Sequence, residues 1–450
     1  MKNKLRTHFK RIQENTDVHT LEVFKKSSLA TIVRVIGMVC GIVLSVLVAR
    51  MIGAEGLGII SLSNRIVTFI ITIGLVGMPS VIVKEVAIAK NKNESQPISD
   101  VMNTAYWFNG LVMFSISVIT ILSSPWLVNF VFKKPALLYP LIIMISVTTP
   151  QVFSRIFSSG MKGIKKIWQS SLVDNTLSSL ISLLLLSIIW LLQIKITIEV
   201  VAIVYAIGRV IVTIVAGLHW KQSKNYNRQF RFNLKEYIKT ALPLYIVSIS
   251  GTLANHFDII ILAFFADPIH VGLYAVASRL ALLIVFALNV TLSTVSPKIA
   301  YLYASGKTSE LETMIQKTTK ISGVISLIPM IIYLIFGHYI LGLWGPKFIS
   351  AFHILIILSL GQVINVLTGA VGQILIMTGE EVLQSKITIF FAVYGLIQTV
   401  IAGHLYGVIG IAYSQTINIV LVNIVKSIYI YKRRNIDVYG LYKRRGQSIS

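Results

Sequence analysis

The chain has 450 residues, of which 55% are hydrophobic and 13% are charged. This composition excludes a disordered chain and a single large soluble domain, and it predicts an integral membrane protein. The 41 Lys and Arg residues outnumber the 17 Asp and Glu residues, which gives a formal net charge of +24. Such an excess fits either a nucleic-acid partner or the cytoplasmic loops of a membrane protein, so its distribution along the chain decides between them.

Long apolar stretches separated by charged segments predict an all-α protein with twelve membrane-spanning helices. The first apolar stretch begins too late for a cleaved secretory signal, so we expect the first span to remain as an anchor. The spans are expected near residues 28–49, 58–82, 101–122, 138–159, 169–192, 198–219, 241–265, 272–296, 321–343, 351–377, 384–405 and 408–430.

The basic residues follow this expected topology. If the N-terminus is cytoplasmic, thirty Lys and Arg residues lie in or at the edges of cytoplasmic segments, five lie in external loops, and six lie within spans. Lys and Arg are enriched in cytoplasmic loops of membrane proteins. The pattern therefore predicts a multi-pass protein of the cytoplasmic membrane with both termini inside, and it excludes nucleic acid as the main ligand.

The spans fall into two groups of six. We expect a cytoplasmic N-terminal segment at 1–27, an N-lobe at 28–219, a cytoplasmic linker at 220–240, a C-lobe at 241–431 and a cytoplasmic tail at 432–450. The linker is strongly basic. Its charge is typical of a topology signal that also contacts anionic lipids, and a specific regulatory site is the alternative.

An internal repeat relates the two lobes. GIISLSNRI at 58–66 matches GLYAVASRL at 272–280 with a constant offset of 214 residues, which pairs Gly58 with Gly272 and Arg65 with Arg279. One proline and one further glycine follow in each half, at offsets of 218 and 216 residues. These matches indicate duplication of a six-span unit, and an even number of spans gives both copies the same orientation in the bilayer.

Four segments carry a resemblance to a known family: ARMIGAEGLGII (49–60), GLVGMPSVIVKEVA (74–87), VGLYAVASRL (271–280) and YGVIGIAYSQTINIVLVNI (406–424). They resemble the Wzx-type polysaccharide flippases of the multidrug/oligosaccharidyl-lipid/polysaccharide (MOP) exporter superfamily. The resemblance implies a V-shaped, MATE/MOP-like transporter that moves undecaprenyl-diphosphate-linked oligosaccharide across the cytoplasmic membrane by alternating access. It also implies membrane lipids and polysaccharide polymerase machinery as partners.

Three arginines are the candidate substrate-binding residues. Related lipid II flippases use arginines of the first, second and eighth spans in a cationic cavity, and Arg34, Arg65 and Arg279 occupy similar places. An arginine at membrane depth costs at least about 2.5–3.5 kcal/mol, and a guanidinium can bind diphosphate oxygens through paired hydrogen bonds. The alternative for each is an ion pair with a buried acid or a position at the interface; we favour this alternative for Arg155 and Arg209.

Two acidic residues lie within the spans. Asp174 of the fifth span and Asp258 of the seventh are candidates either for binding a coupling ion or for forming a salt bridge, and the salt bridge is the commoner role. His256 has no second ligand at helical spacing, and Cys40 is the single cysteine. We therefore expect no metal site, no disulfide, no catalytic residues and no cofactor.

Two other functions remain as alternatives. One is a cation-coupled exporter of drugs or metabolites with the same fold, although relatives of that kind commonly carry an acidic residue in the first span, where this chain has Arg34. The other is an integral-membrane enzyme such as a glycan polymerase. The longest expected external loop has about 15 residues, a length typical of a simple connection, which weighs against the enzyme.

Overall fold

A computed structural model describes residues 18–222, 232 and 234–439. Parts of the expected N-terminal segment, central linker and C-terminal tail therefore lie outside the described residues. The described part of the chain is helical throughout and contains no β-strand. The all-α fold expected from the apolar pattern is confirmed.

The helices of the N-lobe are joined mostly by short turns. They are α2 (Val18–Leu75), α3 (Met78–Asn91), α4 (Gln96–Trp126), η1 (Leu127–Phe132), η2 (Pro135–Leu137), α5 (Leu138–Ser146), α6 (Thr148–Gly163), α7 (Ile167–Ser171), η3 (Leu172–Thr176), α8 (Leu177–Leu191) and α9 (Ile198–Gln222).

The C-lobe contains fewer and longer helices. They are α10 (Leu234–Phe265), α11 (Pro268–Ala304), α12 (Thr308–Gly342), η4 (Pro346–Ala351), α13 (Phe352–Leu367), α14 (Val371–Met377) and α15 (Glu381–Arg434).

These helices are compatible with twelve membrane crossings. Eight described helices are long and apolar enough to span a bilayer, or ten when each of two bent pairs is counted as one span. In that count α2 and α15 are single helices, although α2 is divided at Gly53 and α15 at Gly407, where the backbone is not helical. Each therefore supplies two crossings.

Local sequence explains where the expected spans and the helices differ. No loop separates the first two spans, because the helix continues to Gly53, whose φ of 75° suits glycine and reverses the chain without a connecting loop. The expected span at 138–159 is bent by 45° between α5 and α6. At the start of α11, the side chain of Asp267 accepts a hydrogen bond from the backbone N–H of His270 and caps the helix before Pro268.

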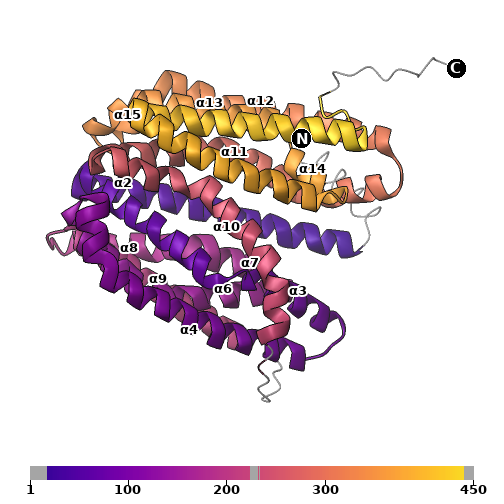
Figure 1. Cartoon of the computed structure of the whole chain (residues 1–450), viewed down its shortest axis with the longest axis horizontal. Coiled ribbons are helices and arrows are strands. Elements are labelled where there is room, and N and C mark those ends of the chain that lie inside the picture. Colours follow the sequence, from indigo (N-terminus) through magenta and orange to yellow (C-terminus); the bar gives the residue numbers. More distant parts are fainter. Residues whose placement is uncertain (1–17, 223–231, 233, 440–450) are drawn as a thin grey trace, which may run out of the picture.

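The helices form two bundles that converge at one end of the molecule (Figure 1). One bundle contains α4, α6, α8 and α9, and the other contains α11, α12, α13 and α15. Helix α10 packs against α15 of the C-lobe and also against α2 and α3 of the N-lobe, while α2 and α11 form the most extensive contact of any helix pair. We call the end at which α2 turns at Gly53 the closed end; toward the opposite end the bundles diverge.

Large apolar side chains remain exposed on the outside of the bundles. On α4, for example, Trp107, Leu111 and Leu122 are each more than two thirds exposed. In water such a surface would drive association, whereas hydrocarbon tails cover it at no cost. The chain is therefore a multi-pass membrane protein, as its composition predicts.

Candidate functional site

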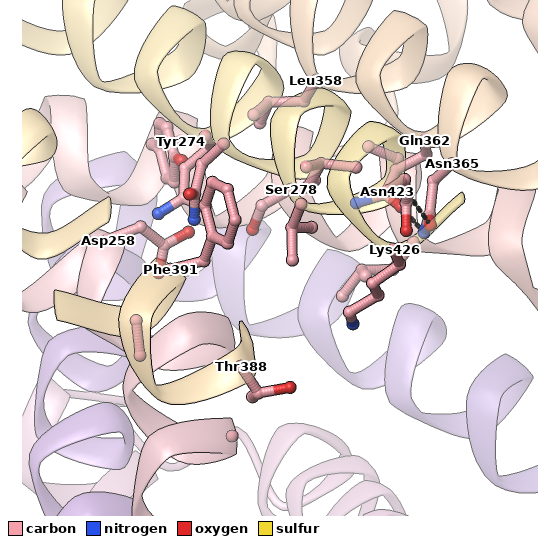
Figure 2. A pocket seen from close by; sticks show the side chains of 18 of the residues that line it. Asp258, Tyr274, Ser278, Leu358, Gln362, Asn365, Thr388, Phe391, Asn423 and Lys426 are labelled. Carbon is pink, nitrogen blue, oxygen red and sulfur yellow. Dashed lines mark hydrogen bonds between the residues drawn. The ribbon is translucent and has the colours of Figure 1, made fainter. Parts of the chain in front are cut away.

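A polar cavity of about 340 Å³ opens inside the C-lobe next to the lobe boundary (Figure 2). Helices α10, α11, α13 and α15 supply its lining, and Arg65 of α2 reaches it from the N-lobe. Asp258 and Tyr274 lie at one end of the view, Ser278 lies between, and Gln362, Asn365, Asn423 and Lys426 lie at the other end. A space between membrane helices that is lined by polar side chains is typical of a substrate pathway.

Arg65 connects α2 to α10. Its Nη1 atom hydrogen-bonds Nδ1 of His256. Because a guanidinium only donates, Nδ1 of His256 is the acceptor in this contact. Two turns further along α2, the hydroxyls of Thr72 and Thr252 are 3.3 Å apart. The polar face of this part of α2 therefore lies against α10, and the half-buried Arg65 side chain forms part of the cavity wall.

Asp258 shares the cavity with Arg65. Its side chain is only 8% exposed, and its Oδ1 atom accepts a hydrogen bond of 2.8 Å from the backbone N–H of Ile259. Within the described residues Asp258 forms no ion pair at salt-bridge distance, although the positive charge of Arg65 is near enough to stabilise the carboxylate. The acid and the arginine therefore line the same cavity.

Arg279 occupies the repeat position that corresponds to Arg65, on α11. Its Nη1 atom donates a hydrogen bond of 2.9 Å to the backbone carbonyl of Gly41 on α2. The guanidinium is exposed at the boundary between the lobes and lies close enough to Arg65 for the two positive charges to repel each other. The structure thus places Arg65 and Arg279 near one another at the lobe boundary.

Arg34 lies apart from this pair. It is exposed on the first part of α2 and lines a separate opening of about 440 Å³, together with Asn175 of η3 and with Phe286 and Asn289 of α11. Within the described part of the chain it has no hydrogen bond or ion pair. Seven residues, about two helical turns, separate it from Gly41, the residue that Arg279 contacts. The three candidate arginines therefore follow the boundary between α2 and α11 and do not line a single cavity.

Asp174 lies elsewhere, in an ion-pair cluster inside the N-lobe. Its carboxylate is 3.1 Å from Nη1 of Arg155 and 2.8 Å from Nζ of Lys162, both on α6. The acid is 8% exposed, whereas the side chains of its two partners are 38% and 44% exposed. This geometry is typical of a structural ion-pair cluster that holds η3 against α6.

Replacing Asp174 with asparagine is expected to reduce stability by about 1–3 kcal/mol, because two cations would lose their counterion while keeping partial access to solvent. Thermal unfolding of the purified protein measures this loss. Transport per folded molecule should stay near the wild-type rate. A normal melting temperature combined with lost transport would instead favour a coupling role for Asp174.

Contacts at the closed end were not predicted from the sequence. Arg50 of α2 donates hydrogen bonds to the carbonyls of Leu343 at 2.8 Å and of Gly342 at 2.9 Å, and Nε1 of the buried Trp344 donates to Ser45 Oγ at 3.0 Å. Nothing in the sequence marks Arg50 as a contact residue, because its partners lie almost 300 residues away.

Two further contacts join the lobes at this end. Nζ of Lys134 donates to the carbonyl of Ala263, and burial lowers the pKa of this lysine while the negative charge of Asp267 opposes the shift. The repeat glycines Gly58 and Gly272 meet backbone to backbone, since a Cβ on Gly58 would lie 2.9 Å from the nitrogen of Gly272. The closed end is therefore sealed by direct contacts between the lobes.

Comparison with known families and proteins gives consistent matches. The model of a family described as "Polysaccharide biosynthesis protein" matches residues 23–302. The chain is 22% identical over 236 residues to a probable low-salt glycan biosynthesis flippase, Agl15, of Haloferax volcanii, covering 51% of this chain and 49% of that protein. It is 24% identical over 394 residues to the probable flippase AglR of the same organism, covering 85% of this chain and 78% of that protein. The chain thus spans only about half the length of the first of these relatives.

Solved structures share the fold. A lipid II flippase, MurJ, in an inward closed conformation matches with a TM-score of 0.73 at 14% identity, covering 89% of this chain and 87% of that chain. A multidrug resistance MATE family transporter of the MOP superfamily, in an inward-facing conformation, matches with a TM-score of 0.72 at 16% identity, covering 90% and 98%. The MATE/MOP-like architecture expected from the sequence is confirmed.

Proposed function

Since the chain belongs to the polysaccharide biosynthesis protein family, we propose that it is a flippase that moves undecaprenyl-diphosphate-linked oligosaccharide across the cytoplasmic membrane for cell-surface polysaccharide synthesis. The observation that carries this proposal is the pair of arginines at the lobe boundary, Arg65 and Arg279, next to a polar cavity. A diphosphate needs fixed donors and positive charge, and guanidinium groups supply both in a poorly hydrated space.

The lobe arrangement supports alternating access. The two lobes, to which we assign residues 28–219 and 241–431, touch at the closed end through Arg50, Trp344 and the glycine pair. They diverge at the other end. If both termini are cytoplasmic, the closed end faces outward and the cavity is reached from inside. Transport then requires the closed-end contacts to break while the opposite end closes.

The opening beside Arg34 suggests how a lipid-linked substrate enters. It lies between α2 and α11, so a headgroup in the cavity can remain attached to a polyprenyl chain in the surrounding lipid. Membrane lipids and the polysaccharide polymerase machinery are the expected partners. With a negative cell interior, moving about two negative charges outward is favoured by about 4.6 kcal/mol per 100 mV, so the membrane potential can drive the transport.

Deletion of the gene tests the proposal. Loss of the flippase is expected to accumulate undecaprenyl-diphosphate-linked oligosaccharide in the inner leaflet, which mass spectrometry of extracted lipids quantifies after surface-accessible glycan is labelled. The wild-type gene should clear the accumulation. A mutant with Arg279→Ala should transport about tenfold more slowly, because one charge-assisted contact to diphosphate is lost.

A matched control is available at the open end. Arg433 is exposed on the last turn of α15 and contacts neither cavity, so Arg433→Ala should restore transport fully. Absence of any lipid-linked accumulation in the deletion strain would contradict the flippase. Full rescue by Arg279→Ala would preserve the flippase and remove Arg279 from the headgroup site.

The buried carboxylate of Asp258 favours a second candidate, a cation-coupled exporter of drugs or metabolites. A carboxylate without an ion pair in a membrane cavity can bind Na⁺ or H⁺ and release it when the lobes move. Cation-dependent uptake of a fluorescent organic cation into proteoliposomes, lost in Asp258→Asn, would favour the exporter. Uptake of lipid-linked oligosaccharide alone would favour the flippase.

A further inference from the structure

The C-lobe cavity has a second polar end that the diphosphate site does not use. Gln362 and Asn365 of α13 and Asn423 and Lys426 of α15 line this end, which we call the amide end. In Figure 2 they lie across the cavity from Asp258 and Tyr274. Four polar side chains from two helices thus face the same space, across the cavity from Asp258, the acid that interacts with Arg65.

The amides of the amide end form a directed hydrogen-bond chain. Nδ2 of Asn423 donates to Oδ1 of Asn365 at 2.8 Å, and Nδ2 of Asn365 donates to Oε1 of Gln362 at 3.1 Å. Within the described residues the Nε2 group of Gln362 has no acceptor. Because Asn423 is 94% buried by its neighbours and the chain fixes each amide, the Gln362 donor group is held in place at the cavity wall.

Lys426 supplies positive charge beside this chain. It is half-buried on α15, and it forms no ion pair or hydrogen bond in the part of the chain that the structure describes. Asp258 is the acidic residue among those that line the cavity, and it lies at the opposite end. Without a counterion among the described residues, this ammonium group is available to pair with an anionic ligand in the cavity.

We propose that the amide end binds an acidic sugar of the transported oligosaccharide, with Lys426 pairing with the sugar carboxylate and the fixed amides bonding to its hydroxyl groups. This inference rests on the proposed flippase function and names its substrate class. A single ammonium group with neighbouring amide donors suits one carboxylate on a hydroxylated ring, whereas the paired guanidinium groups at the lobe boundary suit a diphosphate. The two sites would hold the two parts of one substrate.

Binding to the full-length protein in lipid nanodiscs tests the inference. The probes are two synthetic disaccharides on a short polyprenyl diphosphate that differ only in the terminal sugar, glucuronate in one and glucose in the other. The wild type is expected to bind the glucuronate probe about tenfold more tightly, which is the scale of one charge-assisted hydrogen bond. Lys426→Met should remove this preference while leaving affinity for the glucose probe unchanged, and Lys426→Arg should retain it.

Lys386→Met is the matched control, because Lys386 is exposed near the start of the same helix and lies outside the cavity. It should keep the wild-type preference. Equal weakening of both probes by Lys426→Met would mean that Lys426 contacts the diphosphate, and it would overturn the inference. Equal affinity of the wild type for both probes, with both transported in proteoliposomes, would overturn the inference and leave the flippase intact. Transport of neither probe would overturn both.

Discussion

Substituting valine for Gly58 is expected to slow transport by about a hundredfold, the largest effect expected of any single change at the closed end. An added Cβ would overlap the carbonyl oxygen of Pro268 and press against the backbone nitrogen of Gly272. Backbone atoms cannot rotate away as a side chain does, so the lobes must separate. Overpacking of this kind costs about 1–3 kcal/mol, which is enough to depopulate the conformation in which this end is closed.

Proteoliposomes containing a fluorescent lipid-linked oligosaccharide measure the transport rate, and hydrogen exchange in the turns at 266–267 and 343–345 measures separation of the lobes. Gly272→Val should give the same defect, since the two glycines touch. Gly342→Ala is the control, because its Cβ would meet nothing within 4 Å and its carbonyl still accepts from Arg50. A Gly58→Val protein that transports as fast as Gly342→Ala would show that the close contact is not required.

The internal repeat could be predicted from the sequence, but the contact between its two copies could not. Gly58 and Gly272 were matched by a constant offset, because close backbone approach admits glycine alone and so preserves it in both copies. The offset does not show that the two copies meet each other. That contact follows from the packing of α2 against α11, which joins segments more than 200 residues apart.

Helical spacing likewise shows which charged and polar residues share a face, but not what that face contacts. Arg65 and Thr72 are seven residues apart, a spacing that puts them on one face of α2, and the structure shows that this face lies against α10. Spacing alone did not separate Arg34, beside its own opening, from Arg65 and Arg279. The amide end was not predicted either, because its residues come from two helices and no spacing within one span links them.

The closed-end contacts of Arg50 could not be predicted for a related reason. A guanidinium near a helix end is typical of a topology signal, and its carbonyl acceptors leave no signature in the sequence because every residue has a carbonyl. Side chains that bond to backbone become visible only when the fold brings the two segments together. Side-chain partners such as Asp174 and Arg155 are easier to anticipate, since both members are chemically distinctive.

Arg65→Ala is expected to lower affinity for a lipid-linked diphosphate by about a hundredfold, because a guanidinium that makes paired, charge-assisted hydrogen bonds contributes up to about 3 kcal/mol. Arg65→Lys should recover part of this loss, since the charge remains but the planar pair of donors does not. Binding of undecaprenyl diphosphate to protein in nanodiscs measures both effects, and a normal melting temperature shows that the fold is intact.

The double mutant Arg65→Ala/Asp258→Asn distinguishes diphosphate binding by Arg65 from simple neutralisation of Asp258. Arg65 also lies near the buried Asp258, so Arg65→Ala leaves that carboxylate without a nearby positive charge. If Arg65 served only to neutralise Asp258, then adding Asp258→Asn should restore binding and transport. If Arg65 binds the diphosphate, the double mutant should stay about a hundredfold weaker than Asp258→Asn alone. Recovery in the double mutant would therefore contradict a headgroup role for Arg65 and make it a counterion.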